Sequence, residues 1–120
     1  MSISRQNLTV IIVTFKSENV IHECIRSIDK EIKIIVIDNS NNKEFKKDLE
    51  MKYKNVECIL SEKNLGMGAG NNIGIKNSKS DYVFILNPDV ILQKNTIEEL
   101  INASKEISTF GVIAPFEVDT

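Results

Sequence analysis

The chain has 120 residues, of which 42% are hydrophobic and 27% are charged, and its formal net charge is -2. This length suits one domain, residues 1–120, with a single core, and the composition excludes general disorder. Because lysines are interleaved with acidic residues, the sequence carries no electrostatic signature of nucleic-acid or anionic-membrane binding. We find neither a transmembrane run nor a signal-peptide layout, so we expect a cytoplasmic protein.

Four short segments rich in Ile and Val predict β-strands. They are Leu8–Phe15, Ile32–Ile37, Val56–Leu60 and Tyr82–Leu86, and Val112–Ala114 is a candidate for a fifth strand. Their hydrophobicity is nearly continuous, which is typical of strands that are covered on both faces in a parallel sheet.

The segments between these strands show helical patterns. The first places Ile21, Cys24, Ile25 and Ile28 on one helical face, with Ser17 as the expected N-cap. We expect a mainly polar helix over residues 42–54 and a glycine-rich helix over residues 66–78. We expect Asn95 or Thr96 to cap a fourth helix, which faces inward through Ile97, Leu100 and Ile101.

The alternation of strands and helices predicts an α/β protein with a doubly wound, mainly parallel sheet in a three-layer α/β/α arrangement. In such sheets, ligands bind beyond the carboxyl ends of the strands, where the strand order reverses. Thr14, Asp38 and Asp89 each occur where a predicted strand stops. The fold would therefore bring them to one edge.

Asn87, Pro88 and Asp89 interrupt the apolar run VFILNPDVIL. Pro88 biases Asn87 toward an extended conformation, so we expect Asn87 to finish the strand and Asp89 to stand just past it. One interpretation is a solvated turn. The other is a hard oxygen ligand for Mg²⁺ or Mn²⁺ that is shared with substrate phosphates. Asp38 has a similar pair of interpretations, an Asx turn or an acceptor for a base or a ribose hydroxyl.

The segment NLGMGAGNNIG contains four glycines, of which Gly68, Gly70 and Gly74 have a G-x-G-x-x-x-G spacing at the start of a predicted helix. They permit either close approach of the backbone to an anion or tight packing of the helix on the sheet. The dinucleotide fingerprint has similar glycines, but it belongs in the first strand-to-helix turn. That turn is TFKSEN, without glycine, which disfavours a dehydrogenase or a methyltransferase.

Few other side chains suggest a catalytic or metal-binding role. Cys24 and Cys58 lie far apart within apolar patterns and lack metal-ligand spacing, so we interpret both as reduced core thiols. His22 falls toward the polar face of its helix, where we expect a solvated side chain. No convincing Ser/His/Asp set can be built.

Taken in order, the motifs VIIVTF, IDNSNN, NLGMGAGNNIG, YVFILNPDVIL, TIEELI and GVIAPF resemble the N-terminal part of a family 2 glycosyltransferase of GT-A fold, in the rhamnosyltransferase-like branch. The resemblance implies that the nucleotide base and ribose are held by Thr14, Phe15 and Asp38. It implies further contacts to the nucleotide sugar from Asn64, Gly66, Gly70, Asn72 and Asn87. Asn87-Pro88-Asp89 corresponds to the family's D-x-D element, so Asp89 would bind the divalent cation, Mg²⁺ or Mn²⁺, that bridges the diphosphate.

Three departures from the family pattern are visible. Asn87 replaces the first acid of D-x-D, which leaves Asp89 as the sole obvious carboxylate ligand. Lys16 stands where the family often has Asn. Family members are also more than twice as long, and their general base and acceptor site lie in the part that would follow Thr120, so no catalytic residue is expected in this chain.

The resemblance implies an inverting glycosyltransferase that moves a sugar from a UDP- or dTDP-sugar to a hydroxyl of a carbohydrate or lipid-linked acceptor, in bacterial surface polysaccharide synthesis. This chain would be the donor-binding half of a longer enzyme, inactive alone, and the enzyme could be peripheral to the inner membrane through other parts. Two alternatives stay open. A sugar nucleotidyltransferase would need a glycine-rich, basic loop after the first strand, and a non-catalytic interaction domain would bind ligand without Asp38 and Asp89.

Overall fold

The computed structural model of the chain describes residues 2–105. The elements within this range, in chain order, are β1 (Leu8–Thr14), α1 (Ile21–Arg26), β2 (Lys33–Asp38), α2 (Lys43–Lys52), β3 (Val56–Leu60), α3 (Gly66–Asn77), β4 (Tyr82–Leu86) and α4 (Thr96–Lys105). The candidate fifth strand, Val112–Ala114, lies outside the described residues.

The four strands form one parallel sheet with the order β3-β2-β1-β4. The chain moves outward from β1 to β3 and then returns to the other side of β1, so the strand order reverses between β1 and β4. In register, Thr14 lies opposite Asp38, and Ile12 lies opposite Leu86. The predicted doubly wound α/β fold is therefore confirmed.

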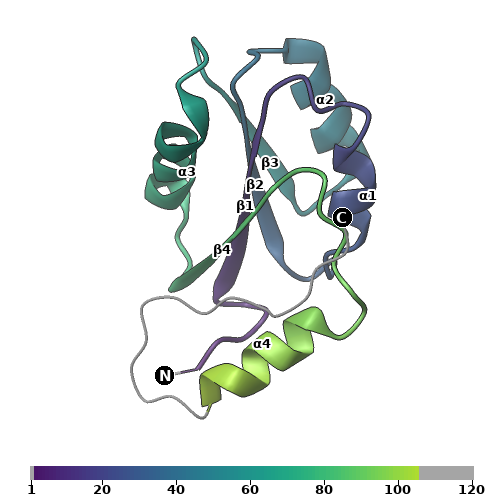
Figure 1. Ribbon diagram of the computed structural model, residues 1–120, viewed down its shortest axis with the longest axis vertical. Coiled ribbons are helices and arrows are strands. Elements are labelled where there is room, and N and C mark those ends of the chain that lie inside the picture. Colours follow the sequence, from purple (N-terminus) through teal and green to yellow (C-terminus); the bar gives the residue numbers. More distant parts are fainter. Residues whose placement is uncertain (1, 106–120) are drawn as a thin grey trace.

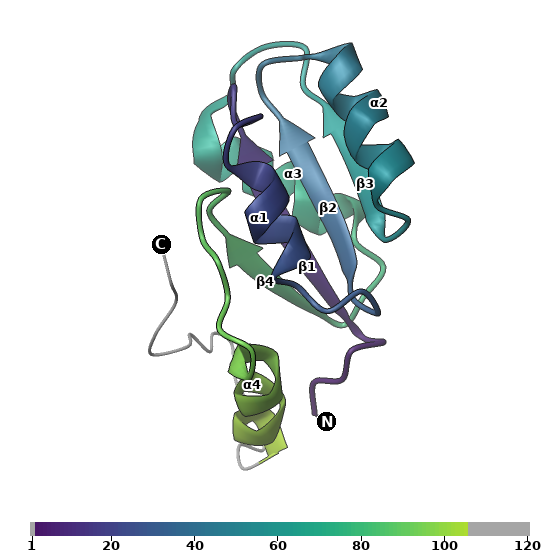
Figure 2. The ribbon, with the colours of Figure 1, turned by 90° about the vertical axis from the view of Figure 1, so that its right-hand side faces the viewer.

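Helices cover the two faces of the sheet unequally. Helix α3 lies on one face, and α1 and α2 lie on the other, as the two perpendicular views show (Figure 1, Figure 2). The main core lies on the α1/α2 face and extends to α4 through Ile97, Leu100 and Ile101. A smaller core under α3 contains Val13, Ile35 and Ile37.

Burial explains why some strands have continuous hydrophobicity and others do not. All residues of β1 are buried, and only Lys33 is exposed in β2, because both strands lie between other strands and under helices. In β4, Phe84 and Leu86 are buried on the α1/α2 face. Val83 and Ile85 point to the α3 face and are exposed, so α3 does not cover the outer part of that face.

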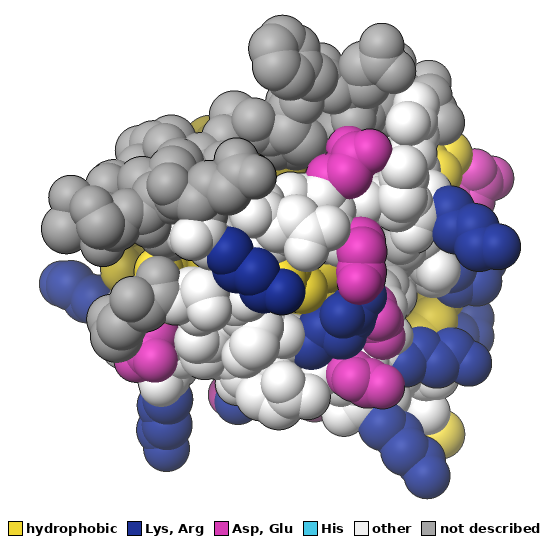
Figure 3. Space-filling view, turned by 90° about the horizontal axis from the view of Figure 1, so that it is seen from below, with side chains coloured by type: hydrophobic (Ala, Val, Ile, Leu, Met, Phe, Trp, Pro, Cys, Tyr) yellow, Lys and Arg dark blue, Asp and Glu magenta, His cyan; other side chains and the backbone are white. Residues whose placement is uncertain are grey.

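Charged side chains hold α4 at the end of the sheet where the strands begin. Arg5 forms ion pairs with Asp29 and Glu98, and the Ile3 N–H donates to Ser104 Oγ at 2.9 Å. Seen from this end, Lys/Arg and Asp/Glu side chains lie next to one another (Figure 3). The view agrees with the interleaved charges of the sequence.

Some predicted boundaries were wrong by one or a few residues. Helix α1 begins at Ile21, and its N-cap is Val20, without a side-chain cap. The predicted cap, Ser17, instead bonds the backbone of Phe15, because three turn residues separate it from the helix. Strand β1 ends at Thr14 and β4 ends at Leu86, so Phe15 and Asn87 follow their strands.

Within residues 2–105, no helix is both long enough and apolar enough to cross a membrane.

Candidate functional site

Thr14 and Asp38 form a buried pair at the carboxyl edge of the sheet. They end two neighbouring strands in register, and Thr14 Oγ1 donates to Asp38 Oδ1 at 2.9 Å. Both side chains are buried, and that of Asp38 has an exposed fraction of 0%. The predicted convergence of these strand ends is thus observed.

The Asp38 carboxylate organises the loop that follows β2. Its Oδ1 also accepts from Ser40 Oγ at 2.7 Å, and its Oδ2 accepts from the Asn42 N–H at 2.9 Å. Asn42 in turn caps α2 by accepting from two N–H groups of the first turn. These hydrogen bonds compensate a charge that would otherwise be costly to bury. The geometry therefore matches the turn interpretation of Asp38.

Phe15 and Lys16 project from the same edge, directly after β1. The Phe15 ring is 49% exposed, and Lys16 Nζ lies 5.3 Å from its centroid, at cation–π distance. Lys16 adopts a left-handed backbone conformation, with φ 53°. Asn tolerates this conformation better than Lys. The Asn that the family often has at this position would therefore fit the backbone with less strain than Lys16.

Asn87, Pro88 and Asp89 form a turn that follows β4. The Val90 N–H donates to the Asn87 carbonyl at 3.2 Å, and the side chains of Asn87 and Asp89 are exposed. No described residue makes a hydrogen bond or an ion pair to the Asp89 carboxylate. Unlike Asp38, Asp89 keeps its oxygens available.

The turn offers one protein carboxylate, that of Asp89, as a ligand for a hard cation. No cluster of three or more His, Cys, Asp or Glu in residues 2–105 could hold a metal ion. Mg²⁺ is commonly bound by one or two carboxylates together with substrate phosphates. Asp89 fits this arrangement, whereas the described part of the chain offers no site built from such protein ligands alone.

Both thiols are buried, which disfavours their nucleophilic thiolate form. Burial raises the pKa of the Cys24 thiol to about 12, and the negative charge of Asp89 adds to the shift. Burial likewise raises the pKa of Cys58 to about 12, with Asp38 contributing. Both cysteines are free and buried, which confirms the prediction of core thiols.

The glycines of α3 divide into two kinds. A Cβ at Gly70 would lie 2.8 Å from Val13 Cγ1, and one at Gly74 would lie 2.6 Å from Ile11 Cγ2. These two glycines let α3 approach β1, so tight packing accounts for them, and a ligand contact at Gly70 stays a prediction. Gly68 and Gly66 face open space, and Gly66 has φ +80°.

The loop before α3 is tied to the loop after β2 by Asn39, which the sequence reasoning missed. Asn39 Nδ2 donates to the Gly66 carbonyl at 3.1 Å, and Asn64 Oδ1 accepts from the Gly66 N–H at 3.1 Å. Asn39 Oδ1 is buried without a partner among the described residues. The only signal for Asn39 was its place in IDNSNN. Asn64 and Asn72 are exposed.

His22 does not match its predicted environment. Its Nδ1 lies 2.7 Å from the Tyr53 hydroxyl, and the rings are 5.7 Å apart. Its side chain is largely buried between α1 and the end of α2, so the expectation of a solvated histidine was wrong. Tyr53, 31 positions away, supplies the partner that the local pattern could not reveal.

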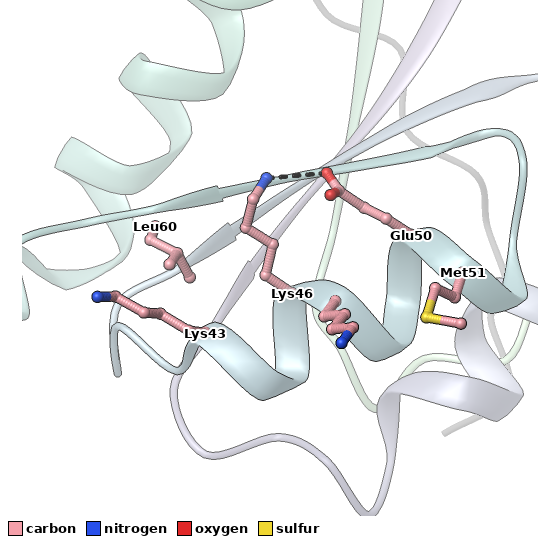
Figure 4. Close-up of a pocket in the computed structure, with 6 residues that line it drawn as sticks. Lys43, Lys46, Glu50, Met51 and Leu60 are labelled. Atoms are coloured by element: carbon pink, nitrogen blue, oxygen red, sulfur yellow. Dashed lines mark hydrogen bonds and ion pairs between the residues drawn. The ribbon is translucent and has the colours of Figure 1, made fainter.

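Two hollows are lined by described residues. One, of about 500 Å³, runs along α2 and is lined by residues including Lys43, Met51 and Leu60 (Figure 4). The other, of about 490 Å³, is lined by residues including Arg26 and Gln93. Neither lining contains a predicted site residue.

Comparisons with known proteins agree on one family. The family described as "Glycosyl transferase family 2" matches residues 9–119. The low-salt glycan biosynthesis hexosyltransferase Agl10 of Haloferax volcanii is 31% identical over 113 residues, which cover 91% of this chain and 36% of that protein. The poly(ribitol-phosphate) beta-N-acetylglucosaminyltransferase TarP of Staphylococcus aureus is 31% identical over 127 residues, covering 95% of this chain and 38% of TarP.

A solved structure extends the comparison to the fold. The mannosyltransferase PcManGT from Pyrobaculum calidifontis, in complex with GDP-Man and Mn²⁺, superimposes with a TM-score of 0.68 at 15% identity. The match covers 78% of this chain and 31% of PcManGT. The chain thus has the GT-A type of sheet and spans about a third of the length of the curated relatives it matches.

Proposed function

The chain belongs to glycosyl transferase family 2, and from this premise we propose that it is the donor-binding half of an inverting glycosyltransferase. The donor is a nucleotide-diphospho-sugar, UDP- or dTDP-linked. The acceptor is a hydroxyl of a carbohydrate or lipid-linked molecule in surface polysaccharide synthesis. The names of Agl10 and TarP, which refer to glycan and poly(ribitol-phosphate) chemistry, support this class of acceptor.

In this proposal the base and ribose lie against the ends of β1 and β2. The exposed Phe15 ring offers an apolar face on which a base can stack. The buried Thr14–Asp38 pair fixes the two loops that flank it. Exposed Asn64, Asn72 and Asn87 supply amide groups toward the sugar and its diphosphate. These residues bind and orient the donor and do not take part in proton transfer.

The exposed carboxylate of Asp89 would hold Mg²⁺ or Mn²⁺ together with the donor's phosphates. When bound, such a cation stabilises the negative charge that develops on the leaving diphosphate. The Mn²⁺ in the PcManGT complex supports this assignment by analogy. Asp89 itself orients the cation and is not the general base.

Neither of the two aspartates assigned to the site is available to deprotonate the acceptor. Asp38 already accepts hydrogen bonds from its own loop, and Asp89 is assigned to the cation. We therefore propose that a base from the remainder of a longer enzyme completes the site, and that the 120-residue chain alone binds donor weakly and turns over nothing. The rhamnosyltransferase-like branch stays a prediction.

The free, buried thiols support a cytoplasmic location, because reduced cysteines of this kind are ordinary in a reducing compartment. A donor made from a nucleotide is consistent with that compartment.

One observation carries the proposal. An exposed carboxylate without a protein partner, Asp89, stands at the same edge as the Thr14–Asp38 pair, on the side of β1 where the strand order reverses. Titration calorimetry of the chain with UDP and with dTDP, each with Mn²⁺ and with EDTA, tests it. We expect heat of binding that is larger with Mn²⁺. A folded chain that gives no heat with either nucleotide would contradict the proposal.

The same titrations separate the rival functions. A non-catalytic domain that has kept the fold predicts that Asp89→Ala leaves nucleotide binding unchanged, whereas the transferase predicts a clear loss. A sugar nucleotidyltransferase predicts tighter binding of a nucleoside triphosphate than of the diphosphate. The turn after β1, residues 15–20, lacks the glycines that such an enzyme would need.

A further inference from the structure

Lys16 is an exposed cation beside the ring that the proposed function assigns to the nucleotide base. Its Nζ lies 5.3 Å from the centroid of the Phe15 ring, so the ammonium covers part of that ring. The ring is 49% exposed. Because cation–π contacts at exposed sites are weak, a flat aromatic ligand that stacks on Phe15 can displace the ammonium.

Hydrogen bonds hold the backbone on both sides of the Lys16 Cα. The Lys16 N–H donates to Ser40 Oγ at 3.4 Å, and Ser40 Oγ donates to Asp38 Oδ1 at 2.7 Å. Ser17 Oγ accepts from the Phe15 N–H at 3.2 Å. Lys16 is thereby kept at φ 53°, a conformation that lysine rarely adopts. Backbone strain of this kind concentrates at functional sites, so it points to a role for this turn.

No carboxylate among residues 2–105 forms an ion pair with the Lys16 ammonium, and no described oxygen accepts a hydrogen bond from it. Other lysines are paired: Lys46 Nζ lies 2.9 Å from Glu50, and Lys52 Nζ lies 3.2 Å from Asp48. The positive charge of Lys16 is therefore available to an anionic group of a ligand.

The strand order favours Lys16 over the other lysine that closely follows a strand at the carboxyl edge. Lys16 stands two residues after β1, and Lys63 stands three residues after β3. In the order β3-β2-β1-β4, β1 borders the point where the strand order reverses, whereas β3 is an outer strand. Ligands of doubly wound sheets bind at that reversal. Lys16 is therefore beside the expected crevice.

The proposed donor is a polyanion, and most side chains assigned to it are neutral. Asn64, Asn72 and Asn87 offer amides without charge. Asp89 adds a negative charge of its own to that of the diphosphate, which the bound cation must offset. A lysine ammonium binds phosphate as a point charge and needs no exact geometry. Lys16 can thus supply positive charge that the other assigned side chains lack.

We propose that Lys16 recognises the diphosphate of the donor. A base that stacks on Phe15 displaces the ammonium from the ring, and the ammonium then pairs with a phosphate oxygen. The fixed backbone keeps Lys16 at the edge, and its flexible four-carbon stem permits both positions. This inference rests on the proposed function and deepens it, because it names a residue that makes the site prefer a nucleotide over a nucleoside.

NMR titrations of the 120-residue chain in Mg²⁺ with uridine, UDP, thymidine and dTDP measure this preference. In Lys16→Asn, which suits the left-handed backbone, we expect both diphosphates to bind about three- to tenfold more weakly. Affinity for the two nucleosides should stay the same or rise, since the Phe15 ring loses its ammonium cover. Lys16→Arg keeps the charge and should keep the preference for the diphosphates.

Lys47→Asn is the matched control. Lys47 is exposed on α2 and forms no ion pair with a described residue, so its substitution removes the same charge and should leave all four affinities unchanged. Added salt gives a second readout. Raising the NaCl concentration should weaken UDP binding more in the wild type than in Lys16→Asn, because salt screens the pair between the ammonium and the phosphate.

The outcomes separate this inference from the proposed function. A folded wild type that binds neither diphosphate contradicts both. A wild type that binds UDP or dTDP, with the same affinity in Lys16→Asn, overturns only the role of Lys16. An equal loss for nucleosides and diphosphates in Lys16→Asn, or an equal loss of diphosphate affinity in Lys47→Asn, overturns it as well, because neither reports a specific contact with phosphate.

Discussion

Asp38 and Asp89 are two carboxylates at the same edge of one sheet, and they have opposite surroundings. Asp38 is fully buried, and both its oxygens accept hydrogen bonds from Thr14, Ser40 and Asn42. Asp89 is exposed in a turn and has no bond to a described side chain. The sequence places both after a strand, so position alone does not distinguish them.

The difference teaches that an acidic residue at a strand end can either stabilise its own loop or stay available to bind a ligand. A carboxylate without a protein partner contributes little to folding and is free to bind a cation. A carboxylate with several buried donors contributes to stability, and any contact with a nucleotide is made by a group that is already fixed. Asp38 therefore mainly fixes the conformation of the loop at the site, and Asp89 mainly supplies negative charge to the site.

The largest effect is expected at Asp38. Asp38→Ala leaves the donors on Thr14, Ser40 and Asn42 without their acceptor in a buried position. We expect a loss of about 2–4 kcal/mol in the free energy of unfolding, measured by urea denaturation with unchanged slope. A loss below about 0.5 kcal/mol, as for an ordinary surface site, would show that the network is not structural.

The glycines of α3 carry the same contrast between buried and open positions. Gly74→Ala puts a methyl group 2.6 Å from Ile11 Cγ2, so we expect a cost of about 1–3 kcal/mol in unfolding free energy. Gly68→Ala meets nothing within 4 Å and should stabilise the helix by up to about 1 kcal/mol. Thermal and urea denaturation of the pair check the signs, and equal effects would contradict the packing account.

Glu50 is an intermediate case between the two carboxylates, and pH reveals its contribution. Burial raises its pKa, but the Cys58 N–H and Lys46 outweigh burial, so the pKa of Glu50 lies below its ordinary value of 4.5. A lowered folded-state pKa means that its stabilisation is present above the unfolded pKa and is lost as pH falls through the folded pKa. We therefore expect the wild type to exceed Glu50→Gln in stability at neutral pH.

That advantage should shrink in urea denaturations below the ordinary pKa of a glutamate. Lys33→Gln serves as a control on charge, because its partner Glu57 is half-exposed and surface pairs contribute little. An advantage of the same size in acid and at neutral pH would mean that the Glu50 charge does not stabilise the β3 edge.

The smallest effect on stability is expected at Asp89. Because no described side chain bonds its carboxylate, Asp89→Ala should change the free energy of unfolding by no more than about 0.5 kcal/mol. Urea denaturation measured beside Asp38→Ala gives the comparison directly. A large loss would show that the carboxylate supports the turn after β4.

The sheet was predictable because its two central strands are covered on both faces, so their hydrophobicity is continuous over β1 and β2. The helix at 96–105 was likewise visible in its periodicity and cap. The polar helix at 43–52 showed a weaker pattern, and the glycine-rich helix at 66–77 was inferred from its place after the third strand. What failed were the hydrogen-bond partners of two side chains, one distant in sequence and one local. Tyr53 determines the environment of His22, and the Phe15 backbone occupies the Ser17 hydroxyl that was expected to cap α1.

For the candidate site, the sequence located the carboxyl edge of the sheet but not the separate roles of the residues along it. Gly68 and Gly70 look alike in NLGMGAGNNIG, and only the distance to Val13 separates a packing glycine from an open one. Asn39 looked like one more polar loop residue, yet it joins the loops after β2 and before α3. Such roles depend on which strands are neighbours, which a single segment does not encode.

The most direct test of the central claim is the metal dependence of nucleotide binding in the wild type and in Asp89→Asn. The account predicts that the wild type binds UDP or dTDP at least about tenfold more tightly in Mn²⁺ than in EDTA, a difference of about 1.4 kcal/mol. It predicts that equally folded Asp89→Asn binds with the same affinity in both. An unchanged Mn²⁺ effect in Asp89→Asn would contradict the assignment of Asp89.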